Sequence, residues 1–290
     1  MVPSRKGEPM GASRAIRSRA ATALMVLAIA APQAAPAREL PSSAVMIDGD
    51  DRLSPAAFAE KNGLSRQQLA SRFGATGLVR CGGAVGTGQL VGAGNVIVTA
   101  AHMLFAPDGL SRDRKALCTF EIETSGGRQV VPIRLADTLC GSREPYADPA
   151  MRDWAVVPLE RTVPGVRPYP LGSALKVPGR LVLVAAARTG GVEAHSLQHC
   201  RARVQTARAP DGLREVAIDC DAEGGTSGAA LLDEEGSFQG VYVGFRSAHP
   251  GQPGPFSMSH YNFGVTAEGG LRRAIMDVVS RHQPLSAAAD

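Results

Sequence analysis

Short apolar segments separated by Gly, Pro and Asp recur along this 290-residue chain from Gly77 onward. Six of them precede a proline-rich stretch at 161–172, and six follow it: 77–81, 88–94, 95–101, 117–123, 128–136 and 153–160, then 180–187, 197–206, 213–220, 228–233, 238–245 and 261–267. Segments of this length and spacing are typical of antiparallel strands in barrels or sandwiches. The two sets predict an all-β chain of two six-stranded antiparallel β-barrels.

The ends of the chain have different patterns. Leu271, Ile275, Val278 and Val279 have the spacing of an amphipathic C-terminal helix. We expect the segments 1–37 (signal peptide), 38–76 (N-terminal extension or pro-segment), 77–165 (N-terminal barrel), 166–267 (C-terminal barrel) and 268–283 (helix).

The first 37 residues predict an export signal. Five basic residues precede an apolar run at 20–30, and Ala35-Pro36-Ala37 forms a small-residue cleavage site before Arg38. The run is too short for a membrane span, which needs about 20 apolar residues. A retained anchor is the alternative, and Met10 is a second candidate for the start of the chain.

The charge of the chain depends on this leader. Its net charge of +4 comes from 31 basic and 27 acidic residues. Residues 38–290 carry 26 of each. A balanced mature chain gives no support for binding nucleic acid.

Between the leader and the strands, residues 39–53 are polar and extended in character. Two short helices are then expected. Ser54-Pro55 is typical of an N-cap followed by proline, and Ser65 with Gln68 forms a capping-box pattern.

Five cysteines in an exported chain favour disulfides: Cys81, Cys118, Cys140, Cys200 and Cys220. Cys200 and Cys220 flank a turn-like segment and are one expected pair, with Cys81–Cys118 as the second. The odd number leaves one cysteine free or bonded between chains. A metal site of Cys200 with His195 and His199 is the alternative, although this segment has a strand pattern.

Three residues have the chemistry of a catalytic triad. His102 follows the apolar segment at 95–101, Asp153 precedes another, and Ser227 lies in the glycine-rich segment GGTSGA. A serine hydroxyl needs a base to become a nucleophile, and the base needs a carboxylate to fix its tautomer. The glycines permit a tight turn that points the N–H groups of Gly225 and Ser227 at one spot, as in an oxyanion hole.

Each of these features alone also has a purely structural interpretation. A histidine after a strand is often structural, an aspartate that opens a strand is common in turns, and a glycine-rich GGTSG segment is often only a loop. Their order, and their place at strand ends in both predicted barrels, favours catalysis in the crevice between the barrels. The order His, Asp, Ser also bears on the fold, because unrelated folds build the triad in different orders.

At these residues the chain resembles the trypsin/chymotrypsin-like serine endopeptidases. TAAH ending at His102, DWAVVPL from Asp153 and GTSGA around Ser227 are similar to the family's motifs. VMIDGDDR at 45–52 resembles the start of bacterial glutamyl endopeptidases of the same fold. The resemblance implies a chymotrypsin-like fold and hydrolysis through an acyl-enzyme.

The sequence departs from the family at several positions. Met103 stands where animal trypsins carry Cys, and Thr226 where they carry the Asp that pairs with a newly cut N-terminus. No I-V-G-G segment follows a basic cleavage site. We therefore expect no activation by N-terminal insertion.

The substrate specificities known in this family cannot be transferred directly to this chain. Asp221 falls where trypsin-like members place the acid that selects Arg or Lys; the alternative is a loop residue beside Cys220. Tyr242, Val243 and Phe245 replace the usual pocket wall, and Tyr242 falls where glutamyl endopeptidases carry His. We still expect this strand to pair with the substrate backbone.

The interpretation is therefore a bacterial serine endopeptidase, secreted or periplasmic, without cofactor or metal. We expect a monomer that acts on proteins or peptides and contacts no membrane after signal cleavage. A non-catalytic binding protein on the same fold is the first alternative. An α/β-hydrolase esterase ranks last, because Ala229 breaks the G-x-S-x-G motif and the chain lacks the strand–helix alternation of that fold.

Overall fold

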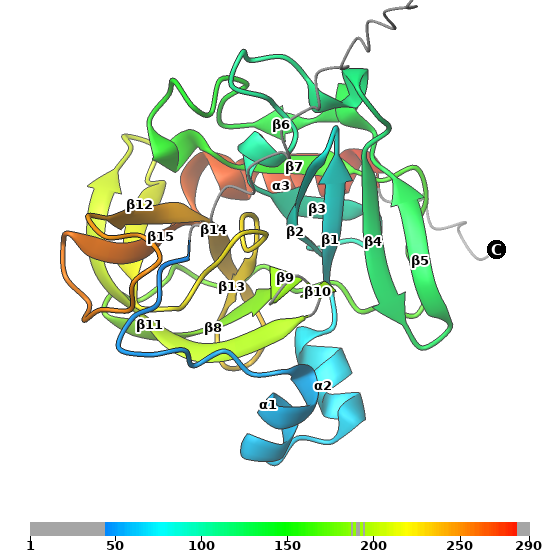
Figure 1. Cartoon of the computed structure of the whole chain (residues 1–290). Helices are drawn as coiled ribbons and strands as arrows, with labels where there is room; N and C mark the ends of the chain where they lie inside the picture. The colour runs from blue at the N-terminus through cyan, green and yellow to red at the C-terminus, as the bar shows by residue number, and fades with distance from the viewer. Residues whose placement is uncertain (1–43, 187, 190–191, 194, 283–290) are drawn as a thin grey trace, which may run out of the picture. The chain divides into compact units, whose positions relative to one another are not determined.

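The computed structural model describes residues 44–186, 188–189, 192–193 and 195–282. The predicted signal peptide lies outside these residues. Two antiparallel β-structures form the body of the described chain, with two short helices before them and a longer helix at the end (Figure 1).

The N-terminal β-structure is a seven-stranded sheet in the order β5-β4-β1-β2-β3-β7-β6. Its strands are β1 (Thr76–Cys81), β2 (Ala84–Leu90), β3 (Val96–Thr99), β4 (Thr119–Thr124), β5 (Gly127–Pro132), β6 (Leu139–Cys140) and β7 (Ala155–Pro158). Six correspond to the predicted segments, and the two-residue β6 is additional. An antiparallel bridge between Ile133 and Leu159 joins the end of β5 to β7, which rolls the sheet toward a closed barrel.

The C-terminal β-structure is a closed six-stranded barrel in the order β11-β12-β15-β14-β13-β8. Its strands are β8 (Gly179–Ala185), β11 (Ser196–Arg208), β12 (Arg214–Ile218), β13 (Ala230–Leu232), β14 (Phe238–Ser247) and β15 (His260–Thr266). A two-stranded ribbon, β9 (Arg188–Thr189) with β10 (Val192–Glu193), follows β8. The predicted fold class, a chymotrypsin-like double barrel with a C-terminal helix, is confirmed.

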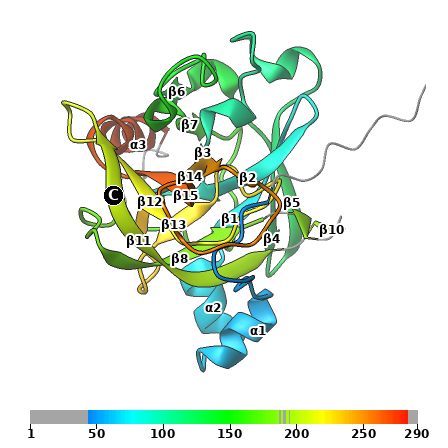
Figure 2. The ribbon, with the colours of Figure 1, turned by 60° about the vertical axis from the view of Figure 1, so that its left-hand side comes forward.

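The helices cover different parts of these sheets. α1 (Pro55–Lys61) and α2 (Arg66–Phe73) begin at the predicted caps: Ser54 Oγ accepts from Ala57 N, and Ser65 and Gln68 bond reciprocally. Phe58 of α1 stacks on His199 of β11 with ring centroids 5.0 Å apart. α3 (Gly269–His282) returns from the C-terminal barrel and packs on β3 and β7 of the other sheet (Figure 2).

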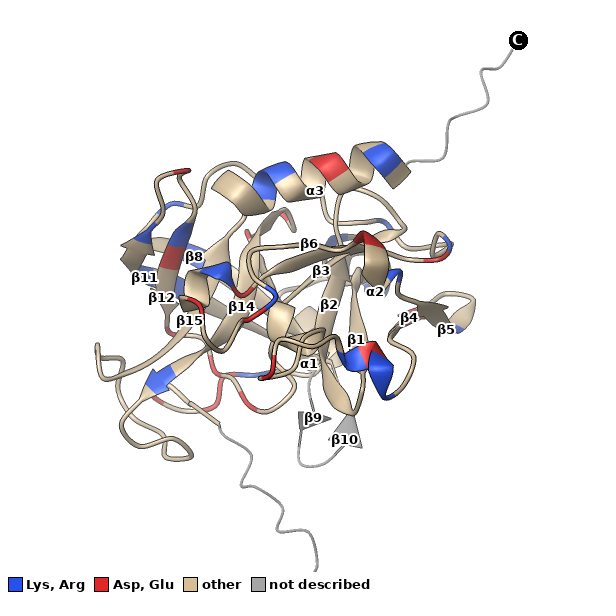
Figure 3. Cartoon of the chain, turned by 90° about the horizontal axis from the view of Figure 1, so that it is seen from above, with Lys and Arg blue, Asp and Glu red and all other residues tan. Residues whose placement is uncertain are grey.

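The barrel interior and the molecular surface follow the expected division of residue types. Leu181, Leu183, Ile218, Leu231 and Tyr242 belong to the cluster that fills the C-terminal barrel. Figure 3 shows the positions of Lys and Arg interspersed with those of Asp and Glu along the ribbon, and α3 carries both signs. No helix among the described residues combines the length and apolar character needed to cross a bilayer.

Both expected cysteine pairs are bonded in the structure. Cys81–Cys118 links the end of β1 to the residue just before β4, and Cys200–Cys220 links β11 to the segment after β12. Cys140 is a free thiol. Since Cys200 is in a disulfide and His199 Nε2 lies 2.9 Å from Asn62 Oδ1, the structure does not form the metal site considered as an alternative.

The Cys200–Cys220 disulfide should stabilise the C-terminal barrel by restricting the unfolded chain. Its cysteines lie 20 residues apart, so the double variant Cys200→Ala/Cys220→Ala should lose about 3 kcal/mol of unfolding free energy. Urea denaturation measures this loss. Cys140→Ala, which breaks no disulfide, is the control, and an equal loss in both variants contradicts the prediction.

Candidate active site

His102 and Asp153 meet because β3 and β7 are antiparallel neighbours. Thr99 at the end of β3 pairs with Ala155 at the start of β7. The chain leaves β3 into a single 3₁₀ turn, Ala101–Met103, while Asp153 ends another such turn just before β7. The two strand ends therefore carry the histidine and the aspartate to one place.

Both oxygens of Asp153 face His102. Oδ1 accepts from the His102 main-chain N–H at 2.9 Å, and Oδ2 lies 2.6 Å from the ring Nδ1. The carboxylate is largely buried, with 10% of its side chain exposed against 19% for His102. A carboxylate partner at Nδ1 favours the proton on that atom and leaves Nε2 as an acceptor.

Two further side chains surround the histidine. Arg112 Nε donates to the His102 carbonyl at 3.0 Å, and Arg112 Nη2 donates to the Tyr146 hydroxyl at 3.2 Å. The Tyr146 ring lies edge-on to the imidazole, 6.1 Å between centroids. Sequence reasoning did not identify either residue, because Arg112 begins a single 3₁₀ turn and Tyr146 lies in a loop, and neither belongs to a motif.

Ser227, the candidate nucleophile, lies in the segment between β12 and β13, which we therefore call the nucleophile loop (residues 219–229). Within it, Thr226 N donates to Glu223 O at 3.0 Å and closes a β-turn. Gly225, the third residue of this turn, has φ of 97°, as in a type II turn that favours glycine. Among the described residues, neither Gly225 N nor Ser227 N has a hydrogen-bond acceptor, so both N–H groups remain available.

Thr87 of β2 holds the nucleophile loop against the N-terminal sheet. Its main-chain N–H donates to Ser227 O at 2.8 Å, and its hydroxyl donates to Gly225 O at 2.9 Å. The same hydroxyl accepts from Ala186 N at 3.1 Å. Sequence reasoning missed Thr87; its flanking glycines, Gly86 and Gly88, were the available signal of a close approach.

Two glycines allow this docking. A Cβ on Gly86 would lie 2.6 Å from Met103 Sδ and 2.9 Å from Ser227 O. A Cβ on Gly228 would lie 2.1 Å from Thr87 O and 2.4 Å from Thr99 Oγ1. The structure thus places the Ser227 loop beside the strand end and turn that carry His102.

The four predicted substrate-binding residues differ in how accessible they are. Asp221 is 1% exposed, Tyr242 3% and Val243 5%, whereas Phe245 is partly exposed. The Tyr242 hydroxyl donates to Asn262 Oδ1 at 2.9 Å inside the C-terminal barrel.

Asp221 bonds within the chain. Its Oδ1 accepts from Ile47 N and its Oδ2 from Asp51 N, both at 2.7 Å. Burial raises the pKa of Asp221 to about 6; the two N–H groups oppose this rise, and the nearby carboxylates of Asp50 and Asp51 add to it.

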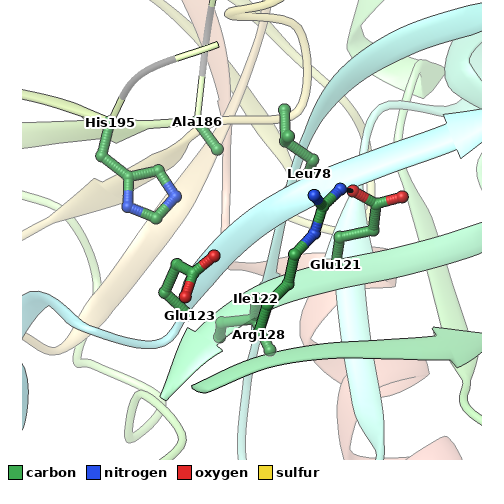
Figure 4. Close-up of a pocket in the computed structure, with 7 residues that line it drawn as sticks. All are labelled: Leu78, Glu121, Ile122, Glu123, Arg128, Ala186 and His195. Carbon is green, nitrogen blue, oxygen red and sulfur yellow. Dashed lines mark hydrogen bonds and ion pairs between the residues drawn. The ribbon is translucent and has the colours of Figure 1, made fainter. Parts of the chain in front are cut away.

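A polar pocket of about 220 Å³ opens near the Thr87 contact but contains none of the three triad candidates (Figure 4). Leu78, the partner of Thr87 across β1 and β2, lines it together with Glu121, Ile122, Glu123, Arg128, Ala186 and His195. Arg128 pairs with Glu121, while burial lowers the pKa of His195 and Glu123 partly opposes this effect. No group of three or more potential metal ligands occurs in the described part of the chain.

Comparison with known proteins identifies the family. A trypsin-like peptidase domain matches residues 86–241, more than half of the chain and a span that includes His102, Asp153 and Ser227. The chain belongs to the trypsin-like peptidase family. The family is one of serine proteases, which act on proteins or peptides. No curated protein matches the chain in sequence.

Three solved structures share the fold. A Glu endopeptidase in complex with MPD is 15% identical with a TM-score of 0.58, covering 81% of this chain and 100% of its own. Neuropsin, a serine protease of mouse brain, is 14% identical with a TM-score of 0.52, covering 73% and 96%. Deg5 is 17% identical with a TM-score of 0.50, covering 77% and 92%. At 14–17% sequence identity, these comparisons show a shared fold alone.

The close approach at Gly228 makes a testable prediction. Gly228→Ala adds a methyl group that overlaps Thr87 O at a residue with φ of 84°. Gly212 has φ of 94° with nothing within 4 Å of its Cβ position, so Gly212→Ala isolates the cost of the backbone conformation. We expect Gly228→Ala to lose about 1–3 kcal/mol more unfolding free energy than Gly212→Ala. Equal losses in urea denaturation contradict the contact.

The raised pKa of Asp221 predicts a pH dependence of stability. Between about pH 4 and pH 6 the folded state binds more protons at this residue than the unfolded state, so its contribution falls as pH rises through this window. Urea denaturation from pH 4 to 7 measures the unfolding free energies of the wild type and Asp221→Asn. The advantage of the wild type over the variant should shrink as the pH rises to about 6. A difference independent of pH contradicts the prediction.

Proposed function

We propose that this trypsin-like peptidase is an exported serine endopeptidase that hydrolyses peptide bonds through an acyl-enzyme. The paired contacts of Asp153 with the main-chain N–H and ring Nδ1 of His102 carry the proposal. They fix the imidazole with Nε2 free to accept a proton, which is the state that a general base requires.

Ser227 is the nucleophile in this mechanism. His102 takes the Ser227 hydroxyl proton as Oγ attacks the substrate carbonyl carbon, and Asp153 stabilises the imidazolium that forms. The N–H groups of Gly225 and Ser227 donate to the developing oxyanion. The imidazolium then protonates the leaving amine, the acyl-enzyme remains on Ser227, and a water activated by His102 releases the acid.

Two observations support export. The leader has a basic start, an apolar run and a small-residue cleavage site. The two disulfides favour an oxidising compartment, outside the cell or in a periplasm. A non-catalytic binding role on the same fold is the competing function, and the largely buried Tyr242 in the expected pocket wall is the observation that favours it.

Active-site substitutions test the mechanism. Ser227→Ala should abolish peptide hydrolysis and labelling by a fluorophosphonate while the fold persists. Asp153→Asn should lower kcat about 10⁴-fold, because an amide nitrogen cannot accept the hydrogen bond from His102. Asp137→Asn, at a half-exposed aspartate elsewhere, is the control for loss of a carboxylate.

The site of labelling distinguishes the alternatives. Mass spectrometry should find the phosphonyl group on Ser227. Labelling of another serine overturns the assignment. A folded wild type that neither reacts with the probe nor cleaves a broad peptide library supports the binding function.

A further inference from the structure

The segment before the first helix (residues 44–53, here the N-terminal strap) lies along the C-terminal barrel and reaches the nucleophile loop. Figure 1 shows it in blue, crossing the barrel before it enters α1. Val45 N donates to Ala222 O at 2.8 Å, and Ala222 N donates back to Val45 O at 3.0 Å. The strap therefore pairs with the nucleophile loop as an added antiparallel bridge.

Asp221 joins the strap and the nucleophile loop through its side chain. Its two oxygens accept the N–H groups of Ile47 and Asp51, two points of the strap four residues apart. On the opposite side, the Gln198 amide accepts from Asp221 N at 2.8 Å and donates to Asp221 O at 2.7 Å. The first part of the nucleophile loop is thus fixed between β11 and the strap.

Arg52 connects the strap to the turn that contains Gly225. Its Nη1 lies 2.6 Å from Glu223 Oε1, and only 9% and 12% of the two side chains are exposed. Glu223 opens the turn, because its carbonyl accepts from Thr226 N and its N–H donates to Thr226 Oγ1 at 3.2 Å. This largely buried ion pair links one end of the turn that presents Gly225 N and Ser227 N to the strap, within which Arg52 Nε and Nη2 also pair with Asp50 at 2.8 Å each.

We propose that the N-terminal strap belongs to the active site. Arg52, Glu223 and Asp221 act as positioning residues that hold the turn presenting Gly225 N and Ser227 N, here called the oxyanion turn. The inference rests on the proposed role of Gly225 and Ser227. It assigns residues 44–53 to the mature enzyme, so any maturation that removes them inactivates the protein. Removing the strap leaves the buried Asp221 and Glu223 carboxylates without their partners, which is costly.

This assignment differs from a merely structural role in a measurable way. Displacement of the oxyanion turn weakens bonds that form with the developing oxyanion, so it lowers kcat and leaves KM nearly unchanged. Loss of one oxyanion donor typically costs about 10²–10³ in kcat. We expect Arg52→Ala to lower kcat and the rate of fluorophosphonate labelling about 10- to 100-fold.

The experiment compares Arg52→Ala, Glu223→Ala and the double variant in the full mature chain. Arg180→Ala is the matched control, since Arg180 also pairs with a glutamate of the C-terminal barrel, at 3.3 Å and with 73% of its side chain exposed. Each variant is measured for kcat, KM, labelling rate and melting temperature. Glu223→Gln, which keeps the shape of the side chain, replaces Glu223→Ala if the latter does not fold.

The losses should be non-additive, because each single variant breaks the Arg52–Glu223 ion pair, and Arg52→Ala also removes the pair with Asp50. The double variant should therefore be about as slow as Arg52→Ala, with Arg180→Ala near the wild type. Unchanged kcat and labelling rate in folded Arg52→Ala overturn the proposal. So does a loss that appears in KM alone or that Arg180→Ala reproduces.

Amide hydrogen exchange separates this inference from the proposed function. Exchange at 222–227 should be faster in Arg52→Ala than in the wild type and unchanged in Arg180→Ala. A wild type without hydrolysis or labelling overturns the proposed function. The exchange result still decides whether the strap holds the turn, and equal exchange in all three proteins overturns the inference.

Discussion

The contact of Thr87 with the nucleophile loop is the constraint on which the site depends. His102 and Asp153 belong to the N-terminal sheet, whereas Ser227 belongs to the loop that enters β13 of the C-terminal barrel. Thr87 bonds Ser227 O and Gly225 O at once, so one residue of β2 sets the position of both the serine and the turn beside it. The tight packing at Gly86 and Gly228 leaves this docking little freedom.

Local patterns in the sequence were sufficient for much of the fold. The caps at Ser54 and Ser65 formed as expected because they depend on bonds within three residues. The length and spacing of the short apolar segments also predicted both sheets, since the Gly, Pro and Asp residues between them mark where each strand ends. The strand β6 was not predicted, because two residues are too few to show a strand pattern in the sequence. It forms because Leu139 and Cys140 pair with β7, and no local signal specifies that contact.

The site was predictable only where its chemistry had a motif. His102, Asp153 and Ser227 lie in recognisable sequence motifs. The residues that position them are instead far away along the sequence. Thr87 bonds Gly225 138 residues away, and Asp221 bonds Ile47 174 residues away. A threonine in a strand and an aspartate beside a cysteine have many local explanations, so only the tertiary structure distinguishes among them.

The position of Asp221 changes how the likeness to trypsin-like members bears on substrate choice. Both carboxylate oxygens are occupied by N–H groups of the strap, and the residue is almost fully buried. A basic side chain of a substrate would have to displace those hydrogen bonds before it could form an ion pair with Asp221. Otherwise it would have to approach carboxylate oxygens that neutral N–H donors already satisfy. The carboxylate is better explained as the anchor of the strap.

Tyr242 is also bonded within the chain. Its hydroxyl donates to Asn262 Oδ1, and Asn262 Nδ2 in turn donates to Val45 O of the strap. Two of the positions expected to contact the substrate thus belong to one internal network, which ties the N-terminal strap to the loop that carries Ser227.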